Sequence, residues 1–252
     1  NVSLLGPRVT APTSLAMVHI EDGIPSYSFY REGTAERLVT LDSLSKNLTS
    51  EVSIFHIGSL ALTGGKDALV WEEFVKITRE NNVKVSLDPN VRPSLIAEPD
   101  VYRQRIKNLI TEVDILKLSD EDLLWLFNDS ADETNALAEL EVITNAELLI
   151  VTRGAQGSAV FHGKKWHELP SHPLKKLSDT VGAGDTFMAS ILAWLVKNEK
   201  LNQLALLELH EKTDLLHYAG KAAALNCEKQ GCNPPWENEL LKYMKNTCRP
   251  LI

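Results

Sequence analysis

Short apolar runs and amphipathic stretches alternate along most of the chain from residue 52 onward. Runs rich in Val, Ile and Leu predict buried β-strands at 52–57, 83–88, 113–118 and 148–152. Helical spacing of apolar residues predicts helices between these strands, at about 66–81, 99–111 and 132–145. This alternation predicts a mainly parallel sheet wrapped by helices, which is an α/β fold.

The start of the chain has a different pattern. Residues 14–20 and 27–31 are β-like runs on either side of Asp22-Gly23, a turn signal between strands. Because these runs have a polar face, they predict a hairpin that forms a flap rather than a layer of the core.

The later part of the chain continues the α/β pattern. Residues 157–162 predict a strand that pairs with its predecessor across a turn at Gly154. Long helices are predicted at 185–197 and 213–229. The first of them is apolar on nearly every side, which predicts a buried position in the middle of the fold.

Composition and charge narrow the range of functions. The 252 residues suffice for one large domain, and a hydrophobic share of 44% is ordinary for a globular protein. No apolar run is long enough to span a membrane. The formal charge of −8 argues against nucleic acid as the main partner, because a phosphate backbone binds basic surfaces. The three cysteines lack the spacing of a zinc site and are expected to be reduced thiols of a cytoplasmic protein.

The strongest chemical signal is the segment 179–187, which reads Asp-Thr-Val-Gly-Ala-Gly-Asp-Thr-Phe. Gly182 and Gly184 allow the backbone to approach a ligand closely where a helix begins. Around Ala183, the first amides of that helix are donors without helical partners, which makes the helix start an anion site. Asp185 lies in the first turn, where the helix dipole keeps its carboxylate ionised.

A carboxylate beside an anion site suits a reaction better than simple binding. Like charges repel, but a hydroxyl group placed between them can lose its proton to Asp185 while it receives a phosphoryl group. The segment therefore predicts phosphoryl transfer to an alcohol, with Asp185 as the general base. Gly-Ala-Gly-Asp alone has an alternative interpretation, a helix start capped by Asp185.

The full segment resembles the C-terminal signature of the ribokinase-like (PfkB) carbohydrate kinases almost letter for letter. In that family the aspartate is the base, and the Gly-Ala-Gly amides form the anion hole. The resemblance implies a three-layer α/β/α ribokinase-like fold with a small β lid, and it implies ATP and Mg²⁺ as cofactors. The chain has no GxxxxGK[ST] motif and no complete GxGxxG motif, which argues against a P-loop enzyme and against a dinucleotide-binding oxidoreductase.

Two predicted strand ends resemble further elements of this family. Segment 86–93 is similar to the DPNxR element near the sugar and the phosphates, which implies Asn90 and Arg92 as contacts. Taken alone, it also fits a simple Asp-Pro-Asn turn.

Segment 117–122 stands where the family has an NxxE element that organises magnesium. Here the element reads Ser119-x-x-Asp122 and departs from the family at both ends. The resemblance implies that Lys117 and Ser119 contact ATP and that Asp122 contacts Mg²⁺. Taken alone, the segment fits a helix N-cap at Ser119.

The last third of the chain resembles the nucleotide-binding segments of the family. Residues 151–157 are similar to a VTxGxxG turn, and residues 222–235 resemble the helix and loop that bracket adenine. Besides Gly182 and Gly184, the implied ATP contacts are Thr152, Gly154, Gly157, Asn226 and Gly231. Taken alone, the second segment also fits a helix that Gly231 ends and that prolines stop.

Two charged residues in these segments carry further expectations. Arg153 is unusual within the VTxGxxG turn and is expected to reach the triphosphate. Asp179 is the implied ligand of a monovalent cation, K⁺. The seven histidines are scattered and are expected to be structural or to lie on the surface.

Segments 29–35, 55–60 and 231–235 resemble the fructokinase branch of the family. The implied substrate contacts are Tyr30, Arg31, Asn90, Arg92 and Asp185. The 2-keto-3-deoxygluconate kinases also carry an aromatic-Tyr-Arg flap and an Arg after Asp-x-Asn, and there the two arginines hold the substrate carboxylate as paired forks. A sugar acid is therefore the alternative to fructose, beside other substrates of sugar or nucleoside kinases.

The resemblance runs from about residue 11 to 240 and implies one ribokinase-like domain over 1–252, with 13–31 in the lid. The family's N-terminal portion has no counterpart before Asn1, so we expect either that this sequence is part of a longer protein or that the chain binds sugar poorly. Family members often pair through their lids, so we expect a homodimer with no nucleic-acid or membrane partner. A kinase fold kept as a non-catalytic binding protein is the alternative class, although a pure binder has no use for a base at Asp185.

Overall fold

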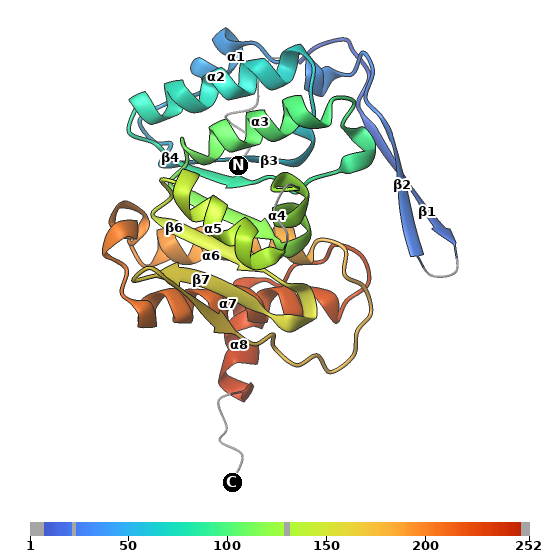
Figure 1. Ribbon diagram of the computed structural model, residues 1–252. Coiled ribbons are helices and arrows are strands. Elements are labelled where there is room, and N and C mark those ends of the chain that lie inside the picture. Colours follow the sequence, from blue (N-terminus) through green and yellow to red (C-terminus); the bar gives the residue numbers. More distant parts are fainter. Residues whose placement is uncertain (1–7, 22–23, 129–131, 248–252) are drawn as a thin grey trace.

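The computed structural model describes residues 8–21, 24–128 and 132–247. Its main sheet has the strand order β3-β4-β5-β6-β7-β8 (Figure 1). The strands are β3 (Ile54–Gly58), β4 (Lys84–Asp88), β5 (Ile115–Ser119), β6 (Leu148–Thr152), β7 (Ser158–His162) and β8 (Lys165–Leu169). Strands β3 to β6 are parallel, whereas β7 and β8 pair antiparallel. The predicted, mainly parallel sheet is confirmed.

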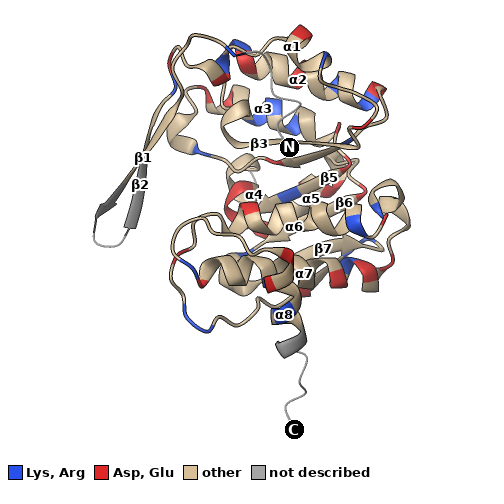
Figure 2. Ribbon diagram, turned by 180° about the vertical axis from the view of Figure 1, so that it is seen from behind, with Lys and Arg blue, Asp and Glu red and all other residues tan. Residues whose placement is uncertain are grey.

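Helices cover both faces of this sheet. One face carries α2 (Lys66–Glu80), α3 (Pro99–Ile110), α4 (Asp120–Leu126) and α5 (Glu133–Ile143). The opposite face, seen in Figure 2, carries α6 (Ala183–Lys197) and α7 (Leu209–Cys227). Two further helices are α1 (Leu41–Ser45) and α8 (Glu237–Thr247). The protein therefore has the expected three layers, α/β/α.

Alternation along the strands divides the core into two parts. Leu87 and Leu116 pack toward α2–α5, whereas Ile115 and Ile150 pack toward α6 and α7. All four side chains are fully buried, because a parallel strand between two helical layers has no solvent-facing side.

Helix α6 is less enclosed than its sequence predicts. Phe187, Ile191 and Leu195 are buried against the sheet and α7. Val196, in contrast, is 52% exposed. The expectation of burial on nearly every side is therefore wrong, since one face of α6 meets no other described element.

The predicted hairpin is present and lies outside the main sheet. Strands β1 (Leu15–Glu21) and β2 (Ile24–Tyr30) form a separate antiparallel pair that projects from the body (Figure 1). Arg31 joins its base to the body, because its Nη1 donates to Thr63 Oγ1 at 2.8 Å. The predicted turn at Asp22-Gly23 falls outside the described residues.

The carboxyl ends of β3 to β6 meet at one edge of the sheet, where α/β folds bind their ligands. β3 and β4 approach each other closely there. A Cβ on Gly58 would lie 1.8 Å from the carbonyl oxygen of Asp88. Only glycine fits this position, and the close approach brings the loops after both strands together.

None of the described helices is both long and apolar enough to cross a membrane.

Candidate active site

The start of α6 is shaped by a left-handed turn at Gly182. Its φ is +74°, and a Cβ there would lie 2.3 Å from Cys232 Sγ. A side chain at this position would therefore be both strained and obstructed. The backbone amides of Gly184 and Asp185 have no hydrogen-bond partner among the described residues, whereas the Ala183 amide donates to the Thr180 carbonyl at 3.1 Å. The donors left for an anion are thus those of Gly184 and Asp185.

Two side chains hold this turn against the loop after α7. Asp179 accepts hydrogen bonds from the amides of Val181 at 2.9 Å and Gly231 at 3.0 Å. These bonds lower the pKa of Asp179. Asn226 is fully buried, donates to the Val181 carbonyl at 2.8 Å and accepts from the Asn233 amide at 2.9 Å. The structure thus gives both residues backbone partners that fix the turn.

Asp185 opens into a cavity of about 260 Å³, here called the Asp185 cavity. Its wall includes His56, Ser59, Asp88 and Asn90 from the ends of β3 and β4. The carboxylate therefore lies opposite the strand-end loops at the ligand-binding edge of the sheet.

Arg92 stands behind Asn90 rather than in the cavity wall. Its Nη1 donates to Asn90 Oδ1 at 2.6 Å and to the carbonyl of Val91 at 3.1 Å. Asn90 itself adopts a φ of +43°, a conformation that is uncommon outside glycine. Arg92 thus holds Asn90 in this turn, and the Asn90 amide nitrogen is the group left for a ligand.

A buried ion pair lies beneath the start of α6. Lys117 Nζ is 2.9 Å from Asp88 Oδ2, and both side chains are 5% exposed. Burial raises the pKa of Asp88, and the nearby ammonium of Lys117 opposes that rise. A Cβ on Gly184 would lie 3.5 Å from Lys117 Nζ, so this ammonium reaches the anion site. Sequence reasoning placed Lys117 at the site but gave no role to Asp88.

Ser119 and Asp122 form a capping box at the start of α4. Ser119 Oγ accepts from the Asp122 amide at 3.0 Å, as the helix N-cap interpretation expects. The Asp122 carboxylate accepts from the amides of Val91 at 2.8 Å and Ser119 at 3.3 Å. Both of its oxygens are engaged, and within the described ranges no group of three potential metal-ligating side chains occurs. The metal contact of Asp122 stays a prediction.

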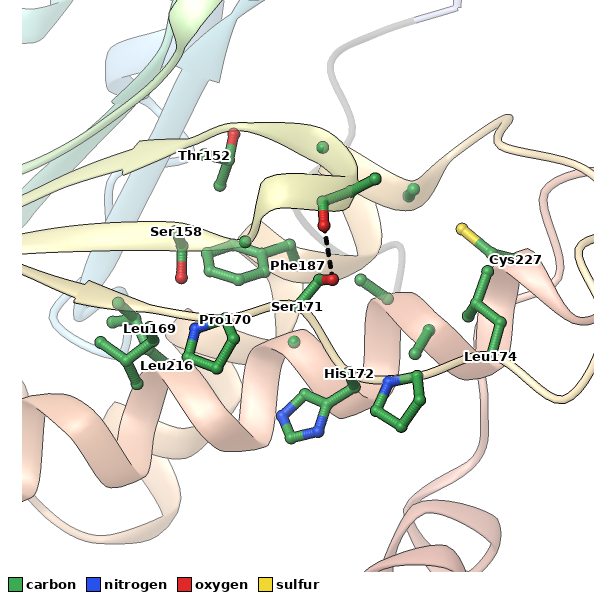
Figure 3. A pocket seen from close by; sticks show the side chains of 18 of the residues that line it. Thr152, Ser158, Leu169, Pro170, Ser171, His172, Leu174, Phe187, Leu216 and Cys227 are labelled. Atoms are coloured by element: carbon green, nitrogen blue, oxygen red, sulfur yellow. Dashed lines mark hydrogen bonds between the residues drawn. The ribbon is translucent and has the colours of Figure 1, made fainter.

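A second cavity, of about 440 Å³, lies on the other side of the α6 start and is here called the Gly184 cavity. Figure 3 shows its mainly apolar wall. Three predicted nucleotide contacts, Thr152, Gly154 and Gly157, line it together with Gly184. Ser171 closes one side by donating to the Ala155 carbonyl at 2.6 Å (Figure 3). Gly184 and Asp185, neighbours in the chain, thus face two different cavities.

Tyr30 and Arg31 lie elsewhere. They line a third cavity, of about 760 Å³, at the base of the hairpin. Arg31 forms an ion pair of 2.5 Å with Glu36 there. The structure therefore does not bring Tyr30 and Arg31 into the Asp185 cavity.

Arg153 also has other partners than those expected. Its Nε lies 2.6 Å from Glu133 Oε1, and its Nη1 lies 3.6 Å from Glu168. These ion pairs hold the guanidinium outside the wall of the Gly184 cavity.

Similarity to known proteins identifies the family of this chain. The model of the pfkB family carbohydrate kinases matches residues 1–239. The chain belongs to this family. A fructokinase of Rhizobium leguminosarum bv. trifolii is 35% identical over 80% of this chain and 60% of its own length. A probable fructokinase-5 of Arabidopsis thaliana is 30% identical over 94% of the chain and 72% of its own length.

A solved structure agrees with the fold. The crystal structure of a fructokinase from Xylella fastidiosa with bound ATP is 26% identical, with a TM-score of 0.84 over 96% of this chain and 76% of that one. The expected family and fold are therefore confirmed. This pfkB family member spans 60% of the length of the Rhizobium enzyme, and the roles of its individual site residues stay predictions.

Proposed function

We propose that this pfkB family member transfers the γ-phosphate of ATP to a hydroxyl group of fructose, with Asp185 as the general base. The observation that carries this proposal is the position of α6, whose first turn separates two cavities. Gly184 faces one cavity with free backbone amides, and Asp185 faces the other with a carboxylate. ATP occupies the Gly184 cavity and the sugar occupies the Asp185 cavity, so the reacting groups meet at the helix start.

Each group at this helix start has a separate task. Asp185 accepts the proton of the sugar hydroxyl as its oxygen attacks phosphorus. The amides of Gly184 and Asp185 donate to the charged phosphate oxygens, and Lys117 adds positive charge from below. Asn90, which Arg92 holds in place, orients the sugar from the opposite wall.

Both predicted metal ligands already have backbone hydrogen-bond partners in this structure. The oxygens of Asp122 accept from the amides of Val91 and Ser119, and those of Asp179 accept from Val181 and Gly231. A Mg²⁺ ion that enters with ATP needs few protein ligands, because phosphates and water fill most of its coordination sphere. We therefore propose that Mg²⁺ enters as part of the ATP substrate, while the contacts of Asp122 with Mg²⁺ and of Asp179 with K⁺ stay predictions.

Two observations favour fructose over a sugar acid. The curated relatives described above are named as fructokinases. Arg31 and Arg92, which could together hold a carboxylate, point to different partners: Arg31 pairs with Glu36, and Arg92 holds Asn90. The two guanidinium groups therefore do not form a joint binding site for a carboxylate in this structure.

Substrate preference tests this choice. We expect kcat/KM for fructose to exceed that for 2-keto-3-deoxygluconate by at least about tenfold, roughly the worth of one or two good contacts. Arg92→Lys should lower kcat/KM for fructose only moderately, because the arginine acts through Asn90. A preference for 2-keto-3-deoxygluconate, with a severe loss in Arg92→Lys on that substrate alone, would contradict the fructose assignment.

We also propose that two copies pair through the β1–β2 hairpin. Leu15, Met17 and Val18 on β1 and Tyr30 on β2 are about half exposed or more, at 54%, 48%, 52% and 62%. The hairpin is a two-stranded sheet whose outer edges pair with no other described strand. Exposed apolar strands with open edges are typical docking surfaces.

Light scattering on the purified protein tests this dimer. We expect a dimer for the wild type and a monomer for the double variant Met17→Lys/Val18→Glu. The circular dichroism spectrum of the variant should match that of the wild type. A monomeric wild type at micromolar concentration contradicts the proposal. We also propose a cytoplasmic location. Reduced cysteines are typical of the cytosol, and the described cysteines Cys227 and Cys232 are free thiols.

A further inference from the structure

His56 lies in the Asp185 cavity, although no role follows for it from the sequence. Side chains alternate along β3, so that Ile57 joins the core beneath α2–α5 while His56 faces the α6 side of the sheet. On β4, Ser86 is the residue directly opposite His56 in the parallel register. His56 Nδ1 lies 2.7 Å from Ser86 Oγ. Within the described part of the chain, His56 Nε2 has no hydrogen-bond partner.

The surroundings of Ser86 decide which ring nitrogen carries the proton. Ser86 is fully buried, and a buried hydroxyl group needs an acceptor for its hydrogen. His56 Nδ1 is the acceptor within reach of its oxygen. Ser86 therefore donates to Nδ1, and the proton of the neutral ring must be on Nε2. The ring is held by its hydrogen bond, with an N–H donor left over.

The charges around the ring are consistent with this neutral form. Partial desolvation of the ring lowers the pKa of His56, although the residue as a whole is exposed. Asp185 on α6 raises this pKa, and Lys117 on β5 lowers it. Asp88, on β4, lines the same cavity but is already paired with Lys117. A neutral imidazole at physiological pH is an uncharged donor that does not form a fixed ion pair with the base.

We propose that His56 determines acceptor specificity by donating its Nε2–H to an oxygen of the bound sugar. This inference rests on the proposed function, and it adds a contact that the function does not require. An ionised Asp185 only accepts hydrogen bonds, so the remaining oxygens of a polyol need donors from other side chains. The Asn90 amide and His56 Nε2–H supply such donors from two neighbouring strand ends. Phe55 and Trp71 also line this cavity, on the α2 side of β3, where their rings stack on each other.

Kinetics of His56 variants test the contact. His56→Phe keeps a ring of similar size but removes the donor, and we expect the KM for fructose to rise by about 10- to 100-fold. The KM for ATP should stay within about twofold, because the Gly184 cavity does not include this residue. Ser86→Ala keeps the imidazole but releases Nδ1, so we expect a smaller rise of about three- to tenfold in the KM for fructose. His210→Phe, an exposed position on α7, is the matched control and should change neither KM.

Two results would overturn the inference. One is a His56→Phe protein that melts like the wild type and keeps its KM for fructose within about twofold. The other is a rise of both KM values together, which indicates a structural role.

Nitrogen-15 NMR of the wild-type imidazoles provides a measurement that does not depend on turnover. We expect the shifts of a neutral Nε2–H ring for His56, and a larger change at Nε2 than at Nδ1 when fructose is added. An Nδ1–H ring, or no response to fructose, contradicts the contact. If the wild type phosphorylates no sugar yet fructose perturbs Nε2, then the proposed function is wrong and the His56 contact stands.

Discussion

Asp185→Asn is expected to lower kcat by about 10²- to 10⁴-fold, the usual worth of general-base assistance. Asparagine has the same size and keeps its place in the first turn of α6, so the turn at Gly182 and the free amides should remain. It cannot accept the proton of the sugar hydroxyl. The KM values for ATP and sugar should therefore change only a few-fold, which marks an interaction made in the transition state. Steady-state kinetics with each substrate varied in turn provide the measurement.

Gly184→Ala is the matched comparison at the neighbouring position. The nearest atom to its added Cβ would be Lys117 Nζ at 3.5 Å, an ordinary contact, so the variant should fold. Its methyl group would occupy space beside the anion site, and we expect the KM for ATP to rise while the KM for fructose stays nearly constant. Near-normal kcat in Asp185→Asn would contradict both the base assignment and the mechanism built on it.

Lys117→Met is expected to have the largest effect on stability. The substitution leaves Asp88, which is 4% exposed, without its positive partner in the core of the fold. Removing one member of a buried ion pair typically costs about 3–5 kcal/mol of unfolding free energy, because a charge stays buried and unpaired. Urea denaturation of the variant and the wild type at pH 7 measures this difference.

The pH dependence of Lys117→Met provides its control. Burial already raises the pKa of Asp88 in the folded wild type, and the loss of Lys117 raises it further. At pH values above the pKa of Asp88 in the unfolded chain, the folded variant holds more protons than the unfolded chain. Its free energy of unfolding therefore falls as pH rises and recovers as pH falls. We expect the variant's loss of unfolding free energy relative to the wild type to be smaller at pH 5 than at pH 7. The double variant Lys117→Met/Asp88→Leu should recover much of the loss at pH 7, and a deficit that is equal at both pH values contradicts the buried pair.

The architecture could be predicted because local patterns of apolar residues indicate the order of strands and helices. Buried runs such as 148–152 and the amphipathic stretches between them fix the alternation of strands and helices. The sequence indicated less where contacts with other segments determine the secondary structure. Strand β8, with Lys165 and Glu168 exposed, has little apolar patterning, and it is a strand because it pairs with β7.

The site divides in the same way. The turn at Gly182 and the position of Asp185 follow from a contiguous motif and were predictable. The pairs Asp88–Lys117 and His56–Ser86 each join two strands, and the sequence does not state their register. Arg31 lies outside the Asp185 cavity for another reason. A long, flexible side chain takes the nearest carboxylate, Glu36, and that contact depends on the fold of the hairpin base.

Transfer of phosphate from ATP to sugar is the central claim, and phosphorus-31 NMR of the wild-type protein with ATP, Mg²⁺ and fructose tests it most directly. We predict that the ATP resonances decline while those of ADP and a sugar phosphate monoester grow in equal amounts, and that inorganic phosphate stays constant. A non-catalytic binding protein would bind ATP and fructose, measured by calorimetry in the same buffer, without forming the monoester. Binding of both ligands with no monoester after prolonged incubation would contradict the proposed function.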